Sequence, residues 1–196
     1  GCRLAENAYR KVKEKYNLEL MVKNTLDVYE DALKSFKILV IKLSSLGDMI
    51  LSTAALRVLR EKFPLAKITL LTGVESKDTV LRCPYIDELL VCDFKNRDSG
   101  IWGFLKFSRL LKRNNFDIVI DLQNNRKSHL AAFLSGALDR YGYDNRKSSF
   151  LLNHKIKDTD RFIPPVEHQF RILKMLGIEL KDSHLELWPS PEDESY

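Results

Sequence analysis

The sequence predicts an α/β domain in which a doubly wound, mainly parallel sheet is covered by helices on both faces. Short apolar runs rich in β-branched residues alternate with longer segments whose apolar residues recur at helical spacing. The runs are continuous, which is typical of parallel strands that are buried on both faces. The alternation of such strands with helices favours right-handed connections between parallel neighbours.

Residues 37–63 form the first expected strand, loop and helix, and the rest of the domain is arranged around them. The apolar run 38–41 leads, after an interrupting Lys42, into a short polar loop at 44–48. Apolar residues then recur at helical spacing as far as Phe63, which predicts one helix. Because ligands bind beyond the carboxyl ends of the strands in doubly wound folds, we expect a site at this loop.

Asp48 is the first candidate for a chemical role. It falls at or next to the first turn of the expected helix, where unpaired N–H groups favour an ionised carboxylate. A carboxylate at the mouth of a cleft is placed to accept a proton from a substrate. Capping Asp residues are common at this position, so the spacing alone favours a helix cap over a general base.

The later segments continue the alternation and complete one Rossmann-like domain. Pro64 ends the first helix, and Gly177 is suited to cap the last one. We expect further strands at residues 67–72, 86–92, 116–122 and 140–144. We expect further helices at residues 76–82, 101–112, 127–134 and 165–176, with a polar loop at 95–99.

The chain is expected to have three parts. Residues 1–35 carry two apolar runs at helical spacing, separated by Asn17, which predicts two amphipathic helices whose apolar faces need a partner surface. From Asp182 onwards the chain is rich in Pro and acidic residues. We therefore expect a helical extension or fusion junction at 1–35, a Rossmann-like domain at 36–181 and an interdomain linker at 182–196.

The composition is that of a globular chain with a mild basic excess. Hydrophobic residues make up 44% of the 196 residues, and the formal net charge is +5. This charge suits an anionic substrate or an anionic lipid surface without selecting between them. No apolar run approaches the ~20 residues of a transmembrane helix, and the first residues lack the apolar core of a signal peptide. Three cysteines without a metal-ligand pattern fit a reducing cytoplasm, and these are Cys2, Cys83 and Cys92.

A second group of candidates follows the expected strand 116–122 and so lies at the same edge of the sheet as Asp48. Arg126 and Lys127 could bind phosphate or carboxylate groups on a substrate. A solvated basic helix start is the alternative. Cations are slightly unfavourable at the positive end of a helix, which favours a binding role.

The other titratable residues carry less weight. His168 and Arg171 are three residues apart and share a helix face, where a structural role is the more common one for a surface His. The chain has no Gly-x-Gly-x-x-Gly after the first strand and no P-loop. No metal-site spacing relates His129, His154 and His184. We expect caps or solvated charges at Asp87, Glu88, Asp121 and Asp139, with Asp121 the nearest of these to the expected site.

These motifs resemble the N-terminal domain of the ADP-heptose:lipopolysaccharide heptosyltransferases, glycosyltransferase family 9. The resemblance extends over most of the expected domain, with the same order and spacing of motifs. The matching segments are KILVIKLSSLGD at 37–48, STAAL at 52–56, DIVIDLQ at 117–123, RKS at 126–128 and LGI at 176–178.

The resemblance implies the N-terminal half of a GT-B fold and an inverting, metal-independent glycosyltransferase. The implied reaction transfers heptose from ADP-heptose, or another nucleotide-sugar donor, to an anionic Kdo-lipid A acceptor in lipopolysaccharide biosynthesis, with no further cofactor and no nucleic acid. It implies a cytoplasmic enzyme and allows peripheral contact with the inner face of the cytoplasmic membrane. Most of the donor site would lie in a second domain that this sequence does not include.

The resemblance also assigns roles to individual residues. It implies that Asp48 is the catalytic base. It implies that substrate-binding residues come from the two loops at the carboxyl edge, with the acceptor held by the basic pair, and these residues are Ser44, Ser45, Gly47, Arg126, Lys127 and Ser128.

Residues 1–35 resemble a different family, the C-terminal end of the GT-B glycosyltransferases of family 4. This resemblance implies that the chain spans a junction between two glycosyltransferase modules. An ordinary N-terminal helical extension that packs on the α/β domain is the alternative. The matching positions are Ala5, Val12, Tyr16, Met21, Val22 and Tyr29.

Two other classes of function remain open at this point. A non-catalytic acceptor-binding or scaffold module would bind the acceptor without turnover, because the sequence lacks a donor domain. A Rossmann-like nucleotide-binding protein or oxidoreductase would bind a dinucleotide, but the glycine fingerprint of such domains is missing. Acceptor binding without transfer, or binding of NAD(P), would distinguish these classes.

Overall fold

The first of two compact units, residues 1–35, consists of two helices as predicted. The computed structural model describes residues 2–15, 17–146, 148–157, 163–179 and 182–189. Helix α1 (Cys2–Lys15) and helix α2 (Leu18–Ser35) meet at Asn17, whose Oδ1 accepts a hydrogen bond from the Leu20 N–H at 2.6 Å. Asn17 therefore caps α2. Tyr16, one position of the family 4 resemblance, lies outside the described residues.

The apolar side chains of this unit are exposed, and no described residue of α2 is buried. The exposed large side chains are Leu4, Tyr9, Val12, Leu18, Met21, Val22, Leu26, Val28, Tyr29 and Leu33.

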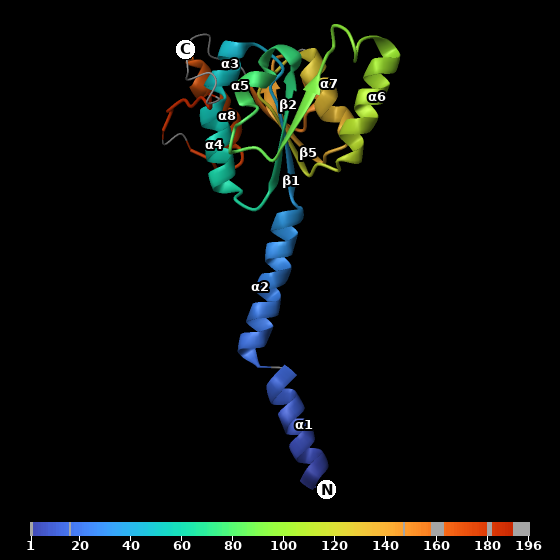
Figure 1. Cartoon of the computed structure of the whole chain (residues 1–196), viewed down its shortest axis with the longest axis vertical. Helices are drawn as coiled ribbons and strands as arrows, with labels where there is room; N and C mark the ends of the chain where they lie inside the picture. The colour runs from blue at the N-terminus through green and yellow to red at the C-terminus, as the bar shows by residue number, and fades with distance from the viewer. Residues whose placement is uncertain (1, 16, 147, 158–162, 180–181, 190–196) are drawn as a thin grey trace. The chain divides into compact units, whose positions relative to one another are not determined.

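The second unit, residues 36–196, is built on a six-stranded parallel sheet with the order β3-β2-β1-β4-β5-β6 across the described residues (Figure 1). The prediction of an α/β domain with a mainly parallel sheet is confirmed. The strands are β1 (Lys37–Ile41), β2 (Lys67–Gly73), β3 (Glu88–Cys92), β4 (Ile118–Asp121), β5 (Asp139–Asp144) and β6 (His154–Lys157).

Strand β6 was not predicted from the sequence. It pairs in parallel with β5 at one edge of the sheet. Its residues alternate between partly buried and exposed, and Lys155 and Lys157 are among the exposed ones. An edge strand that is half in contact with solvent needs no continuous apolar run, so the pattern that identified the other strands is absent here.

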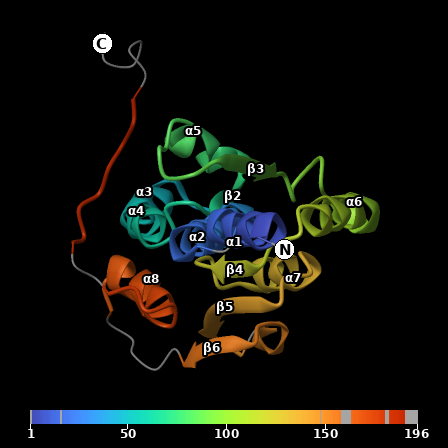
Figure 2. The same ribbon diagram turned by 90° about the horizontal axis from the view of Figure 1, so that it is seen from below.

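Helices cover both faces of this sheet (Figure 2). Strand β1 supplies both cores, because its alternate residues point to opposite faces. Ile38 and Val40 pack in the core that contains residues of α3, α4 and α8, and Leu39 and Ile41 pack in the core that contains residues of α6 and α7. The helices are α3 (Leu46–Leu51), α4 (Thr53–Lys62), α5 (Lys77–Val80), α6 (Gly100–Arg113), α7 (Arg126–Leu134) and α8 (Pro165–Lys174), with short 3-10 turns η1 (Val74–Ser76) and η2 (Ser149–Leu151).

The single helix predicted after the first loop is wrong, because the structure divides it into α3 and α4 at Ser52. The Ser52 N–H donates to the Met49 carbonyl oxygen three residues back, at 3.0 Å. The Ser52 and Thr53 hydroxyls donate to the carbonyl oxygens of Asp48 and Ile50, at 2.7 and 2.8 Å. Ser and Thr hydroxyls that bond to helix carbonyls in this way compete with the regular backbone ladder.

Described residues of the expected linker at 182–196 pack on the domain. Arg57 of α4 pairs with Asp182 at 3.0 Å and with Glu186 at 2.5 Å. The Tyr85 hydroxyl donates to Glu186 at 2.8 Å, and the Tyr85 ring makes an edge contact with Trp188. The hydrogen bond from Arg57, followed by that from Tyr85, lowers the pKa of Glu186. The role of this segment as a link to another domain stays a prediction.

Gly73→Ala should destabilise the fold at the end of β2. The Gly73 N–H donates to the Leu43 carbonyl oxygen at 3.1 Å, and a Cβ at residue 73 would overlap that oxygen. We expect a loss of about 1–3 kcal/mol in the free energy of unfolding, the usual cost of forcing atoms into a packed site. Urea unfolding followed by circular dichroism measures it. Gly47→Ala is the matched control, because a Cβ there meets nothing within 4 Å; equal losses in the two variants would contradict the steric argument.

Candidate active site

The candidate site begins where the loops after β1 and β4 meet at the carboxyl edge of the sheet. The two strands pair in parallel, with Ile41 opposite Asp121, so their following loops emerge side by side. The Gln123 side chain joins these loops, because its Oε1 accepts from the backbone N–H groups of Leu43 and Ser44 at 2.9 and 3.1 Å. One amide side chain thus fixes the backbone that leads to Asp48.

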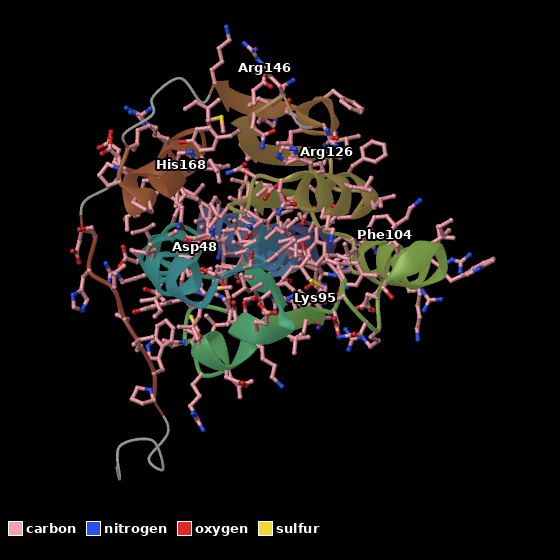
Figure 3. The ribbon with its side chains drawn as sticks, turned by 90° about the horizontal axis from the view of Figure 1, so that it is seen from above. Asp48, Lys95, Phe104, Arg126, Arg146 and His168 are labelled. Atoms are coloured by element: carbon pink, nitrogen blue, oxygen red, sulfur yellow. The ribbon has the colours of Figure 1, made fainter. Side chains whose placement is uncertain are left out.

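Asp48 lies in the first turn of α3, as predicted, with its side chain 47% exposed (Figure 3). Its Oδ2 accepts a hydrogen bond from the Ser45 N–H at 3.4 Å, so it does serve as part of a helix cap. The cap and a chemical role are compatible, because about half of the side chain stays open to solvent.

Lys42 is a residue of this site that was not predicted from the sequence. Its Nζ lies 3.7 Å from Asp48 Oδ2 and donates to the Leu122 carbonyl oxygen at 3.4 Å, while its side chain is only 9% exposed. Burial lowers the pKa of Lys42, and the charges of Asp48 and Asp121 partly oppose that effect. A lone Lys at the carboxyl end of an otherwise apolar buried strand was the signal that could have identified it.

Asp121 and His129 form a fully buried pair beneath the rim. Asp121 Oδ1 accepts from the N–H groups of Gln123 and Asn124, each at 2.9 Å, which shapes the loop after β4. Its Oδ2 lies 3.5 Å from His129 Nε2. Burial raises the pKa of Asp121, against the lowering effect of the Ser128 hydroxyl and the loop N–H groups. Asp121 is thus a loop-shaping group and not the solvated charge that was one of its two expected roles.

The basic pair at the start of α7 is exposed, whereas Ser128 is buried. The Ser128 N–H donates to Asn125 Oδ1 and the Asn125 N–H donates to Ser128 Oγ, both at 2.9 Å. This reciprocal cap leaves Arg126 and Lys127 in the first turn, facing solvent at the carboxyl edge. Ser128 therefore positions the pair in this structure.

A cavity of about 220 Å³ opens beside this loop. Lys127 and Lys95 supply its positive charge, and Lys127 Nζ lies 5.7 Å from the centre of the Phe94 ring. Lys95 pairs with Glu75 at 2.5 Å. Asp48 is not one of its lining residues. The cavity is lined from the ends of four strands by Leu43, Ser44, Gly73, Val74, Glu75, Cys92, Asp93, Phe94, Lys95, Asn125 and Lys127.

The remaining candidates lie away from this cavity. The His168 ring stacks on Tyr143 with 3.8 Å between ring centres, and the Tyr143 hydroxyl donates to the His168 carbonyl oxygen. His154 pairs with Asp139 at 2.8 Å. Within the part of the chain that the structure describes, no group of three His, Cys, Asp or Glu side chains is arranged to hold a metal ion, and no helix is long and apolar enough to cross a membrane.

The cysteines in the described cores are free thiols. Cys83 and Cys92 are both buried. Burial raises the pKa of Cys83 to about 11 and that of Cys92 to about 12, so both thiols stay protonated near neutral pH. Cys92 donates to the Thr72 carbonyl oxygen at 3.3 Å between β2 and β3. These cysteines act as packing residues and not as nucleophiles.

Comparison with known proteins identifies relatives of this arrangement. Residues 104–193 match the sequence profile of glycosyltransferase family 9 (heptosyltransferase). Lipopolysaccharide heptosyltransferase 2 of Escherichia coli K12 is 27% identical over 157 residues, which are 78% of this chain and 45% of that protein. The glycosyltransferase family 9 structure from Veillonella parvula gives a TM-score of 0.73 at 28% identity, over 81% of this chain and 46% of that one.

A more distant structure shares the fold. The Escherichia coli heptosyltransferase WaaC with ADP-2-deoxy-2-fluoro heptose gives a TM-score of 0.64 at 19% identity, over 77% of this chain and 51% of that one. This chain spans about half the length of the relatives it matches. The expected resemblance to family 9 and the expected half of a GT-B fold are confirmed, whereas the roles of individual residues stay predictions.

Lys42→Met should remove a pH dependence of stability. Because burial lowers the pKa of Lys42 from the 10.5 of a free side chain, the unfolded chain binds more protons than the folded chain between those two pKa values. The stability of the wild type relative to the variant should therefore rise with pH in the range just below 10.5, and fall as the pH drops through the folded pKa.

Urea unfolding at a series of pH values measures this difference. Lys62→Met is the matched control, since it makes the same change at an exposed position on α4. A pH-independent difference for Lys42→Met would mean that the Lys42 ammonium is as well solvated in the folded chain as in the unfolded one.

Proposed function

Since residues 104–193 match the glycosyltransferase family 9 (heptosyltransferase) profile, we propose that this chain is the acceptor-binding and base-bearing half of an inverting glycosyltransferase. The observation that carries this proposal is the half-exposed Asp48 carboxylate, held by the Ser45 N–H and 3.7 Å from the buried Lys42 ammonium. The donor is ADP-heptose and the acceptor is a Kdo-lipid A glycolipid of the lipopolysaccharide inner core.

In the proposed reaction Asp48 takes the proton from an acceptor hydroxyl. The freed oxygen attacks the anomeric carbon of the donor sugar from the face opposite the diphosphate. The bond from that carbon to the diphosphate oxygen breaks, and ADP leaves with the electron pair, so the anomeric centre is inverted. General-base assistance of this kind contributes ~10²–10⁴-fold to the rate. Helix N-termini and cations of the second domain would stabilise the leaving diphosphate.

Lys42 and Gln123 position the base for this step. Lys42 Nζ lies 3.7 Å from Asp48 Oδ2, so the ion pair holds the carboxylate at the end of the loop. Gln123 holds the backbone of Leu43 and Ser44, which sets the direction of the loop that ends at Asp48. Ser44, Ser45 and Gly47 then form the surface along which the acceptor hydroxyl approaches.

The basic cavity beside the loop suits the anionic part of the acceptor. Lys127 lines it, and Arg126 is exposed beside Lys127 in the first turn of α7. Carboxylate and phosphate groups bind Lys and Arg through charge-assisted hydrogen bonds. The proposed acceptor carries carboxylates on Kdo and phosphates on lipid A, so its charge is complementary to this surface.

Arg126→Ala with Lys127→Ala should weaken binding of the acceptor to this chain. Loss of two charge-assisted contacts, each contributing ~1.5–3 kcal/mol, predicts a dissociation constant at least ~100-fold higher. Titration calorimetry with Kdo-lipid A in detergent micelles measures it. The control is Lys62→Ala with Lys77→Ala, which removes the same charge from exposed positions on α4 and α5. Equal affinity in the two double variants would place the acceptor elsewhere.

Asp48→Asn should reduce sugar transfer by ~10²–10⁴-fold, because the amide cannot accept the acceptor proton. Transfer from ADP-heptose to Kdo-lipid A is measured in a polypeptide in which this chain is followed by a donor-binding domain. Asp78→Asn, which changes an exposed first-turn carboxylate on α5, is the matched control.

Near-normal transfer by the Asp48→Asn variant would reduce Asp48 to a helix cap. Acceptor binding by this chain with no transfer by the longer wild-type polypeptide would favour the scaffold module instead. Binding of NAD(P) by this chain would favour the nucleotide-binding alternative.

A further inference from the structure

The outer face of α6 is both apolar and cationic. Phe107 and Leu111 of this helix are buried in the core, so the residues on the opposite side face solvent. Ile101 and Trp102 in the first turn are 77% and 83% exposed, and Leu105 and Leu110 are 41% and 47% exposed. The exposed cations that follow are Lys106, Arg109, Lys112 and Arg113, and the helix contains no acidic residue.

The spacing of these residues aligns them into a stripe. Trp102, Lys106, Arg109 and Arg113 are separated by four, three and four residues, which places them on one line along the helix. Ile101, Leu105 and Lys112 form a second line beside it. The N-terminal end of the face is therefore apolar and the remainder is positively charged.

The positive charges of this face are not neutralised by neighbouring carboxylates. Among the described residues, no ion pair joins Lys106, Arg109, Lys112 or Arg113 to an acidic side chain. The acidic residue next to the helix is Asp98, which is 8% exposed and already paired with Arg97 at 2.8 Å. Four cations thus remain available to an external anion.

A hollow of about 560 Å³ lies beside α6, between its cationic residues and Val91 of β3. Its cationic lining consists of Arg97, Lys106, Arg109 and Arg113, and Asp98 is its one carboxylate among the described lining residues. Val91, Phe107 and Leu110 complete it. A hollow with several cations above an apolar floor suits a phosphate group that is attached to an apolar chain.

We propose that the outer face of α6 docks on an anionic lipid surface, with Ile101, Trp102 and Leu105 entering the headgroup region and the α6 cations and Arg97 binding lipid phosphates. Helices that lie on membranes combine Trp and aliphatic residues with Lys and Arg in this manner. Trp favours the bilayer interface because its ring is apolar and its N–H is polar. A nucleic acid would bind the cations but leave the aliphatic residues in water. A protein interface would rarely cover four cations that have no acidic residues among them, because charged residues are depleted at the core of protein interfaces.

The position of α6 connects this surface with the basic cavity. Phe94, which lines the cavity, packs on Phe104 and Phe107 of α6, with ring centres 6.3 and 5.5 Å apart. Phe104 and Lys95 are marked on neighbouring elements in Figure 3. If the cavity takes the sugar of a glycolipid, which rests on the proposed function, then docking by α6 brings the cavity to the membrane where that lipid resides. The docking itself is independent of the reaction.

Vesicle sedimentation with this chain tests the proposal without any donor or acceptor. We expect binding to vesicles of phosphatidylglycerol and phosphatidylethanolamine, and little binding to vesicles of phosphatidylcholine. Binding to the anionic vesicles should weaken as salt is added, because the Debye length falls to ~3 Å at 1 M ionic strength. Failure of the wild type to bind anionic vesicles would overturn the proposal.

Two variants locate the surface. Lys106→Glu with Arg109→Glu should weaken the partition coefficient by at least ~25-fold, since each basic residue near an anionic surface contributes about fivefold. Ile101→Ser with Trp102→Ser should also weaken it. The matched control is Lys62→Glu with Lys77→Glu, which makes the same charge change on exposed residues of α4 and α5. Circular dichroism confirms that each variant is folded. Equal weakening of vesicle binding in the control would mean that binding depends only on the net charge of the chain, and it would overturn the assignment to α6.

Fluorescence gives a direct readout of contact. The chain has two tryptophans, and Trp188→Phe leaves Trp102 as the single reporter. Its emission should shift to shorter wavelength on anionic vesicles and be quenched by brominated lipid. Vesicle binding without quenching would place the contact elsewhere in the chain, for example on residues 2–35. A change of oligomeric state in the Ile101→Ser, Trp102→Ser variant, with vesicle binding intact, would assign the face to a second copy of the chain. Either result would overturn the proposal.

Discussion

The parallel pairing of β1 with β2 on one side and β4 on the other is the constraint on which the candidate site depends. Parallel strands end at the same edge of a sheet, so their loops must share the space beyond it. Gly73 and Gln123 show how closely these loops approach one another beyond the sheet edge. Gly73 brings the end of β2 against the Leu43 carbonyl, and the Gln123 amide takes two N–H groups of the loop after β1. The strand core and the site are therefore one structural unit.

Electrostatics at this edge is governed by how far each charge lies from water. Asp121 is fully buried, Lys42 is nearly buried and Asp48 is about half exposed. The Lys42 ammonium lies 3.7 Å from Asp48 Oδ2, and the charge of Asp121 also acts to raise the Lys42 pKa. The charges of the two carboxylates offset part of the cost of removing the Lys42 ammonium from solvent. The proposed chemical role of Asp48 is additional to its part in capping α3.

The second unit contains two cationic surfaces with different chemistry. At the carboxyl edge, Lys95 and Lys127 line a small cavity, and an acidic partner already lies next to Lys95. On α6 the cations are joined by exposed Ile101 and Trp102 and have no acidic residue within their own helix. The first arrangement suits a defined polar ligand, and the second suits a broad anionic surface with an apolar interior. Phe94 lies next to Lys127 of the cavity and packs on Phe104 and Phe107 of α6.

The sequence by itself determined the α/β class, the strands with continuous apolar runs, the family resemblance and the place of Asp48 in the first turn of α3. Those features depend on local composition and order along the chain. Only the tertiary structure decided the rest. Strand β6 forms because β5 offers it an edge, and its own residues carry no apolar run. The break at Ser52 comes from hydroxyl hydrogen bonds that hydrophobic periodicity does not record. Lys42 becomes part of the site because the fold buries it near the carboxylates of Asp48 and Asp121. Ser128 is buried at the start of α7, where it exchanges hydrogen bonds with Asn125. The burial of Lys42 at the site arises from the packing of residues far apart in the chain, so the local pattern showed only a lone Lys at the end of an apolar strand.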